Sequence, residues 1–119
     1  MEKDMALFAA TLLHSGTNAH FFHWSTNSYA QHKALGKYYE QIIELVDQYA
    51  EAYMGRYEQL KKFPEEFHTE TDPLKYLEAM KNFVAEARKE LPQDTALQNL
   101  IDEIADLINS TIYKLKFLE

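Results

Sequence analysis

Five residues between positions 20 and 51 carry side chains that could bind a metal ion. They are three histidines and two acidic residues: His20, His23, His32, Asp47 and Glu51. Imidazole nitrogens and carboxylate oxygens together form the ligand set of zinc, manganese and non-haem iron sites. These residues therefore predict a site for iron or another divalent metal such as manganese or zinc.

The positions of the acidic residues limit how such a site could be built. Asp47 and Glu51 are four positions apart, so on a helix their side chains lie one turn apart on the same face. His32 precedes Asp47 by 15 positions, which is about 22 Å along an α-helix, so one ion cannot contact both. If these residues serve one site, the carboxylates must come from a second copy of the chain. A two-fold dimer would then contain two identical sites.

The composition of the chain predicts a single all-α domain, residues 1–119. Hydrophobic residues make up 46% of the 119 positions, with only three glycines and three prolines, and the strongest apolar patterns recur every three to four residues. No apolar run approaches the roughly 20 residues needed to cross a bilayer, so no membrane association is expected. The N-terminal segment is too acidic for a secretory signal, and the absence of cysteine suits a reducing compartment. We expect a cytoplasmic protein.

The charge balance argues against a nucleic acid as the partner. The chain has 19 acidic and 12 basic residues, a formal charge of −7, and its longest basic run is Lys61-Lys62. Binding to a phosphate backbone needs a basic stripe or tail. An acidic protein attracts cations instead, although modest acidity also serves simply to keep a small protein in solution.

The apolar pattern predicts four helices arranged as a bundle. The first covers about residues 3–24, and after a polar break at 25–28 the second runs without proline over about 29–62. Residues 63–71 are a polar connection, Asp72-Pro73 begins the third helix, Pro92 ends it, and Asp94 can cap the fourth. The short break makes the first two helices antiparallel neighbours. The longer connection before the third helix could be a turn or a crossover along the bundle.

The second helix has two apolar stripes. The first consists of Leu35, Tyr38, Ile42, Leu45, Tyr49 and Tyr53, and the second of His32, Gly36, Tyr39, Ile43, Val46, Asp47, Ala50 and Met54, with Glu51 at its border. A helix at the edge of a four-helix bundle buries about one face, so the second stripe needs another partner. We expect the chain to dimerise through this helix, with Gly36 allowing a close helix–helix approach.

Two other uses of the same residues need consideration. Asp47 and Glu51 could pair with nearby basic residues such as Lys33 while the histidines form local hydrogen bonds. A metal pair inside a single bundle would need two Glu-x-x-His motifs on separate helices. The motif at residues 65–68 has that spacing but lies in the connection beside Pro64, which disfavours an internal site.

The ligand spacing resembles that of the Dps-like mini-ferritins. His20, His32 twelve positions later, Asp47 after fifteen more and Glu51 after a further four reproduce it, within a match that covers about residues 18–56. His23-Trp24 is similar to the His-Trp pair of that family, in which the histidine before the tryptophan is itself the ligand. Both His20 and His23 therefore stay candidates.

The resemblance implies a ferritin-like four-helix bundle that binds Fe(II) across a two-fold dimer and oxidises it, in assemblies that are commonly dodecamers. Gly36 stands where the family usually has a further acidic ligand, and Glu40 lies one turn on. The chain has no basic N-terminal tail, so DNA condensation is not implied. Residues 28–35 look more like small ferritin-like proteins of tailed phages and cyanophages. The alternative function is a non-catalytic helical dimerisation or interaction protein with a degenerate metal site.

Overall fold

The computed structural model describes residues 2–64 and 71–118, and most of these residues are helical. The elements in chain order are α1 (Glu2–Ser25), α2 (Tyr29–Arg56), α3 (Pro73–Ala87), the short 3₁₀ helix η1 (Arg88–Glu90) and α4 (Thr95–Phe117). The described residues contain no strand, which confirms the predicted all-α class. In the same part of the chain, no helix has an apolar stretch long enough to cross a membrane.

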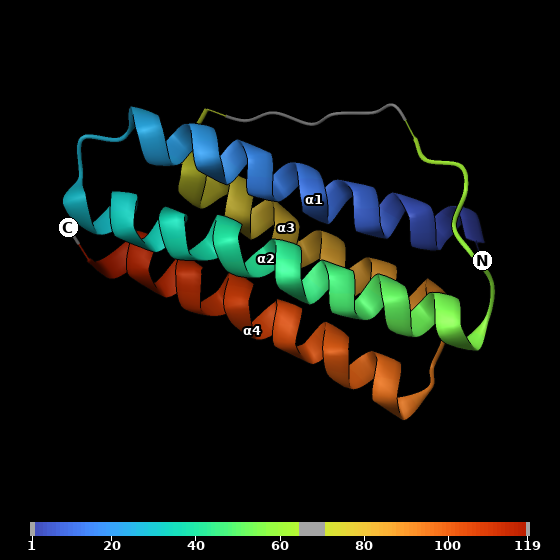
Figure 1. Cartoon of the computed structure of the whole chain (residues 1–119). Coiled ribbons are helices and arrows are strands. Elements are labelled where there is room, and N and C mark those ends of the chain that lie inside the picture. The colour runs from blue at the N-terminus through green and yellow to red at the C-terminus, as the bar shows by residue number, and fades with distance from the viewer. Residues whose placement is uncertain (1, 65–70, 119) are drawn as a thin grey trace.

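The four α-helices form a closed ring of neighbours around one core. α1 packs against α2, α2 against α4, α4 against α3, and α3 against α1 (Figure 1). Most residues of the first stripe on α2 are fully buried, and they pack with apolar residues from the other helices. Large side chains that are fully buried include Phe8, Leu12, Tyr38, Ile42, Tyr49, Leu77, Ile101 and Ile104.

The order of the helices requires a crossover between α2 and α3. Tyr57, directly after α2, donates a hydrogen bond of 2.6 Å to Asp94 at the start of α4. Tyr76, in the first turn of α3, accepts one of 2.9 Å from Asn18 near the end of α1. The end of α2 and the start of α3 therefore lie at opposite ends of the bundle, and the two helices run parallel (Figure 1). Of the two connections that the sequence allowed, the crossover is the one observed.

Two of the predicted helix ends are wrong by several residues. α2 ends at Arg56 rather than near residue 62, because the chain bends at Tyr57, whose hydroxyl is held by Asp94. α3 ends at Ala87, and η1 replaces the last predicted turn before Pro92. The first helix is predicted correctly to within one residue at each end.

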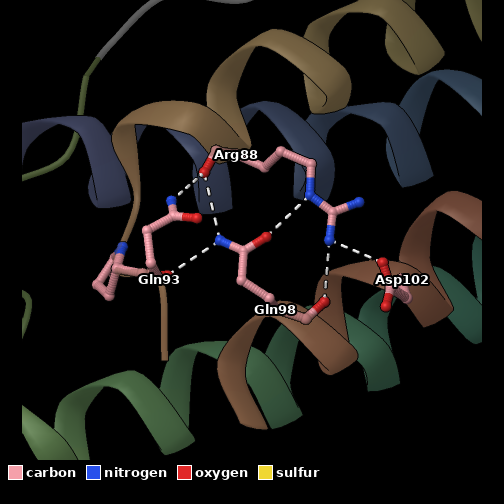
Figure 2. A network of polar contacts seen from close by, with 5 residues as sticks. Arg88, Gln93, Gln98 and Asp102 are labelled. Carbon is pink, nitrogen blue, oxygen red and sulfur yellow. Dashed lines mark hydrogen bonds and ion pairs between the residues drawn. The ribbon is translucent and has the colours of Figure 1, made fainter. Parts of the chain in front are cut away.

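The connection between α3 and α4 is held by the side chain of Arg88. Its Nε donates to the Gln98 side-chain oxygen at 2.9 Å, and its Nη2 donates to Asp102 at 2.7 Å and to the Gln98 carbonyl at 3.1 Å (Figure 2). In return, the Gln98 and Gln93 side-chain amides donate to the Arg88 carbonyl at 3.3 and 3.0 Å. These bonds satisfy backbone groups that the end of a helix leaves without partners.

Candidate functional site

The connection between α1 and α2 brings two of the predicted ligands, His23 and His32, into direct contact. Their rings stack with centroids 3.7 Å apart and planes inclined by 17°. His23 Nδ1 lies 2.6 Å from the His32 carbonyl oxygen, and His32 Nδ1 lies 2.9 Å from the His23 carbonyl oxygen. Each imidazole therefore binds the backbone of the other helix.

The polar residues of the break produce the tight turn that this pairing needs. The Ser28 side chain caps α2 by accepting from the Gln31 amide at 3.2 Å. The Ser28 amide donates to the Thr26 hydroxyl oxygen at 3.1 Å, and the Thr26 hydroxyl donates to the Gln31 side chain at 2.7 Å. Ser28 is thus the N-cap of α2, and the turn places the first turn of α2 beside the last turn of α1.

The hydrogen bonds of the histidine pair fix which ring nitrogens are free. A carbonyl oxygen can only accept, so Nδ1 carries the proton in both rings and donates it. Within the described part of the chain, neither Nε2 has a hydrogen-bond partner. Histidine ligands commonly donate Nδ1–H to a backbone carbonyl while Nε2 binds the metal. Each ring therefore has the hydrogen bond that a metal-ligating histidine commonly makes, but rings stacked 3.7 Å apart and inclined by only 17° cannot both direct Nε2 at one ion unless one ring turns.

His20 extends this cluster along α1. Its ring stacks on Tyr39 of α2, with centroids 4.0 Å apart and planes at 11°, and lies 4.6 Å from the Trp24 ring. The His20 and His23 centroids are 6.1 Å apart. The three histidines therefore lie in one row at one end of the molecule, with His23 rather than His20 directly against His32.

The two glycines on the contact between α1 and α2 have different neighbours. At Gly16 a Cβ would lie 3.1 Å from Ile42 Cγ2 and 3.8 Å from the Tyr39 carbonyl oxygen, so this glycine allows the helices to approach closely. At Gly36 a Cβ would lie 3.1 Å from His23 Cε1. The expectation of a helix–helix contact at Gly36 is thus wrong in detail, because this glycine makes room for an imidazole ring.

The two predicted carboxylate ligands are remote from the histidines of the same chain. Asp47 and Glu51 are exposed on α2, away from the connection, and about 22 Å of helix separates Asp47 from His32. No group of three or more possible ligands surrounds a common point among the described residues. The motif at 65–68 lies outside the described residues. A single copy of the chain therefore provides the imidazoles and the carboxylates at separate places.

A row of aromatic and aliphatic side chains covers the outer surface of α1 and α2 beside these residues. We use the name α1–α2 face for Leu13, His20 and Trp24 of α1 together with Tyr39 and Ile43 of α2. Leu13, Trp24 and Ile43 remain 40%, 66% and 46% exposed, respectively. Ile43 belongs to the second apolar stripe of α2, which the bundle covers in part. Val46 of that stripe is buried in the core, whereas Ile43 and Asp47 are exposed.

The sequence did not point to a group of lysines next to the histidine pair. Lys33 and Lys37 of α2 and Lys114 of α4 line the same cleft as His23 and His32. The four-residue spacing of Lys33 and Lys37 places them on one face of a helix and could have indicated this pair. Lys114 comes from a helix more than 70 positions later in the chain, and only the packing of α4 on α2 brings it there.

Comparison with known proteins identifies relatives without an assigned activity. The family of unknown function DUF5856 matches residues 23–115. A protein of Enterobacteria phage T4, described as an uncharacterized 14.6 kDa protein in the mobD–ri intergenic region, is 30% identical over 99 residues, which cover 81% of this chain and 75% of the relative. No solved structure matches the chain.

These matches correct the family expected from the sequence. The chain matches DUF5856 and a phage protein, and no ferritin-like family is found, so the assignment to the Dps-like mini-ferritins is wrong. The assignment rested on the spacing of His20, His32, Asp47 and Glu51. This spacing is not specific to one family, because many helical bundles can have four polar side chains at such positions. A phage relative is found, as expected, but its description does not make it ferritin-like. Fe(II) oxidation and dodecamer formation, which the resemblance implied, lose that support.

Proposed function

This chain belongs to the family of unknown function DUF5856, and we propose that it is a helical interaction protein that self-associates through its α1–α2 face. The observation that carries the proposal is the exposure of Leu13, Trp24 and Ile43 in one row. Isolated apolar residues on a surface are ordinary, but a contiguous apolar group commonly marks an interaction site.

The side chains of the α1–α2 face lie on neighbouring sides of two packed helices. Leu13, His20 and Trp24 recur at spacings of seven and four, so they lie on one side of α1. Tyr39 stacks on His20, and Ile43 lies one turn further along α2. Gly16 lets the two helices approach closely, and a Cβ there would lie 3.8 Å from Ile43 Cγ1.

The distribution of polar groups favours a second copy of the chain as the partner. The three histidines lie at one end of the α1–α2 face, and Asp47 and Glu51 continue the α2 row beyond its other end. Ile43 lies between the two ends. If two copies meet with their α2 helices antiparallel, the carboxylates of each copy face the imidazoles of the other, as a two-fold interface requires.

A cysteine placed at the expected centre of the interface tests this proposal. The chain has no cysteine, so an Ile43→Cys variant carries a single thiol. Two such thiols near a two-fold axis come within disulfide distance, about 4.4–6.8 Å between Cα atoms. Mild oxidation should convert most of this variant into a covalent dimer. The matched control is Tyr113→Cys, an exposed position on α4 outside the face.

Sedimentation of the unmodified chain provides the second measurement. We expect a dimer at micromolar concentration, and Ile43→Glu should shift it to the monomer because two like charges would then meet at the axis. Tyr113→Glu should leave the dimer unchanged. A chain that sediments as a monomer at every concentration, with equal cross-linking of both cysteine variants, would contradict self-association through this face.

A second candidate function is the binding of a divalent metal ion across this dimer. It is favoured by the two unpartnered Nε2 atoms of His23 and His32, whose Nδ1 protons are held by backbone carbonyls. With Asp47 and Glu51 of the second copy, and with one ring turned out of the stack, they would form a mixed nitrogen and oxygen ligand set, and His20 could add a third imidazole. Such a set suits Fe(II), Mn(II) or Zn(II).

The metal proposal is tested by anaerobic titration with Fe(II) and with Zn(II), followed by elemental analysis. Asp47→Ala/Glu51→Ala should abolish stoichiometric binding while the helical circular dichroism stays unchanged. Glu103→Ala/Asp106→Ala, an exposed pair on α4, removes the same charge and should not affect binding. Admission of dioxygen to the Fe(II)-loaded samples then tests oxidation through the absorbance of ferric product.

Mixing two inactive variants tests whether each site is shared between two chains. His23→Asn/His32→Asn removes both Nε2 atoms but keeps a side-chain N–H for each backbone bond. A heterodimer of this variant with Asp47→Ala/Glu51→Ala contains one intact site, so mixing should restore part of the binding. Binding that survives in either variant alone, or is absent from the unmodified chain, would contradict the metal proposal and leave the proposed self-association standing.

A further inference from the structure

A cleft of about 740 Å³ lies over the first turns of α2, between the end of α1 and the end of α4. Its charged side chains are Lys33, Lys37 and Glu40 of α2 and Lys114 of α4. Tyr29 and Tyr39 add aromatic surface. Among the described residues that line the cleft, lysines thus outnumber carboxylates, although the whole chain has a formal charge of −7.

The lysines of this cleft have no carboxylate partner. Within the described part of the chain, Lys33, Lys37 and Lys114 form no ion pair, in contrast to Arg56, Arg88 and Lys89. Lys37 of α2 and Lys114 of α4 line the same cleft, near enough for the charge of one to act on the other. Burial, together with the neighbouring Lys37 charge, lowers the pKa of Lys114. An anion between the two ammonium groups would relieve their repulsion.

An aromatic ring in the cleft favours a phosphate ester that carries a planar group. The Tyr29 ring is 72% exposed, and the Lys33 ammonium group lies 5.9 Å from its centroid. A ring beside an ammonium group can stack on a planar group while the lysine binds the attached phosphate.

We propose that this cleft binds phosphate, with Lys37 and Lys114 as the two ammonium ligands from different helices. Phosphate can reach the cleft as the free ion or as the ester of a small molecule that carries a planar group. The proposal does not require self-association, because both lysines belong to one copy of the chain, although His23, His32 and Tyr39 line both this cleft and the proposed interface. Its failure would leave the proposed dimer untouched.

The binding test titrates the chain with inorganic phosphate or with AMP at constant ionic strength. Binding is measured through the changes in the amide chemical shifts of the chain. Lys37→Gln/Lys114→Gln should raise the dissociation constant at least about tenfold, since a hydrogen bond to a charged group is lost at each position. Lys75→Gln/Lys81→Gln changes the net charge equally on exposed positions of α3 and should have little effect. Glu40→Gln should tighten binding, because it removes the negative charge that faces the anion.

The two probes distinguish the sources of phosphate. If AMP binds more tightly than inorganic phosphate and Tyr29→Leu removes the difference, the site takes phosphate esters with a planar group. Equal dissociation constants for both probes assign the site to free phosphate. Chemical-shift changes that do not saturate with either probe would overturn the proposal. An equal loss of affinity in Lys37→Gln/Lys114→Gln and in the control Lys75→Gln/Lys81→Gln would overturn it as well.

Discussion

The hydroxyl groups of Ser15 and Tyr38 lie 2.7 Å apart in the core and join α1 to α2. Both side chains are fully buried. Ser15 Oγ also lies 2.5 Å from the Leu12 carbonyl oxygen, to which it donates its proton, so Tyr38 is the donor between the two side chains. Burial raises the pKa of Tyr38 well above its ordinary value, despite the opposing effect of the bond to Ser15, so the phenol keeps the proton that it donates.

This direction of donation predicts an asymmetric effect of removing either group. Ser15→Ala leaves the buried Tyr38 hydroxyl without an acceptor and should lower the free energy of unfolding by about 1–3 kcal/mol. Tyr38→Phe leaves the Ser15 bond to Leu12 intact and should cost only about 1 kcal/mol. Urea denaturation of both variants and of the double variant measures the difference.

The double variant provides the control for this prediction. Once Tyr38 is phenylalanine, no hydroxyl is left unsatisfied by Ser15→Ala, so the double variant should be no less stable than Ser15→Ala alone. Additive losses in the double variant would show that the two groups act independently.

The sequence predicts a fold of this kind better than it predicts the polar contacts inside it. The stripe that contains Tyr38, Ile42 and Tyr49 follows from helical periodicity alone, because burial of apolar area dominates the choice of face. Ser15 and Asn18 are also buried, yet a helical pattern treats such residues as surface positions. Their partners, Tyr38 and Tyr76, come from other helices, and only the packed structure identifies them.

Gly16 and Gly55 should respond in opposite directions to substitution by alanine. At Gly16 the new Cβ would lie 3.1 Å from the Cγ2 atom of the fully buried Ile42, so overpacking should destabilise the protein by about 1–3 kcal/mol. At Gly55 nothing lies within 4 Å, and alanine should stabilise α2 by up to about 1 kcal/mol. Thermal or urea unfolding measures both. Equal effects of the two substitutions would contradict the close approach of α1 and α2 at Gly16.

The candidate site shows the same limit of sequence reasoning as the core. The spacing of His20, His23 and His32 predicts that they lie near one another, because a short break joins two antiparallel helices. The stacking of His23 on His32, and the reason for a glycine at Gly36, depend on the ring orientation that the turn imposes. Lys114 reaches the cleft only through the order of helices around the bundle, which the sequence left open.

Gly36→Ala should disturb the histidine pair more than it disturbs the fold. Its Cβ would lie 3.1 Å from His23 Cε1 and 3.2 Å from His23 Nδ1, the atom that donates to the His32 carbonyl. The His23 ring must shift, while the rest of α2 gains a better helix former. We expect altered imidazole chemical shifts for His23 and His32 with a change in unfolding free energy of no more than about 1 kcal/mol. Unchanged shifts would show that the ring does not depend on Gly36.

The contact between Tyr57 and Asp94 predicts how stability depends on pH in the acid range. The hydrogen bond from Tyr57 is the main cause that lowers the pKa of Asp94 below its ordinary value, and Arg56, 3.6 Å away, adds to it. A carboxyl group with a lower pKa in the folded state stabilises the protein above the ordinary value, about pH 4. This contribution is lost as the pH falls through the pKa of the folded state. Over this range the Asp94 carboxyl group binds more protons in the unfolded state than in the folded state, until it is protonated in both states.

Tyr57→Phe should therefore reduce stability at neutral pH, and the difference from the unmodified chain should shrink as the pH falls below about 4. Urea denaturation at a series of pH values measures this difference directly. Tyr113→Phe is the matched control, because the Tyr113 hydroxyl has no hydrogen bond within the described residues and its ring contact with Phe117 is retained. The control should show no pH-dependent difference. If the Tyr57→Phe difference stays constant down to the lowest pH at which the chain remains folded, the bond to Asp94 does not link α2 to α4 as the structure implies.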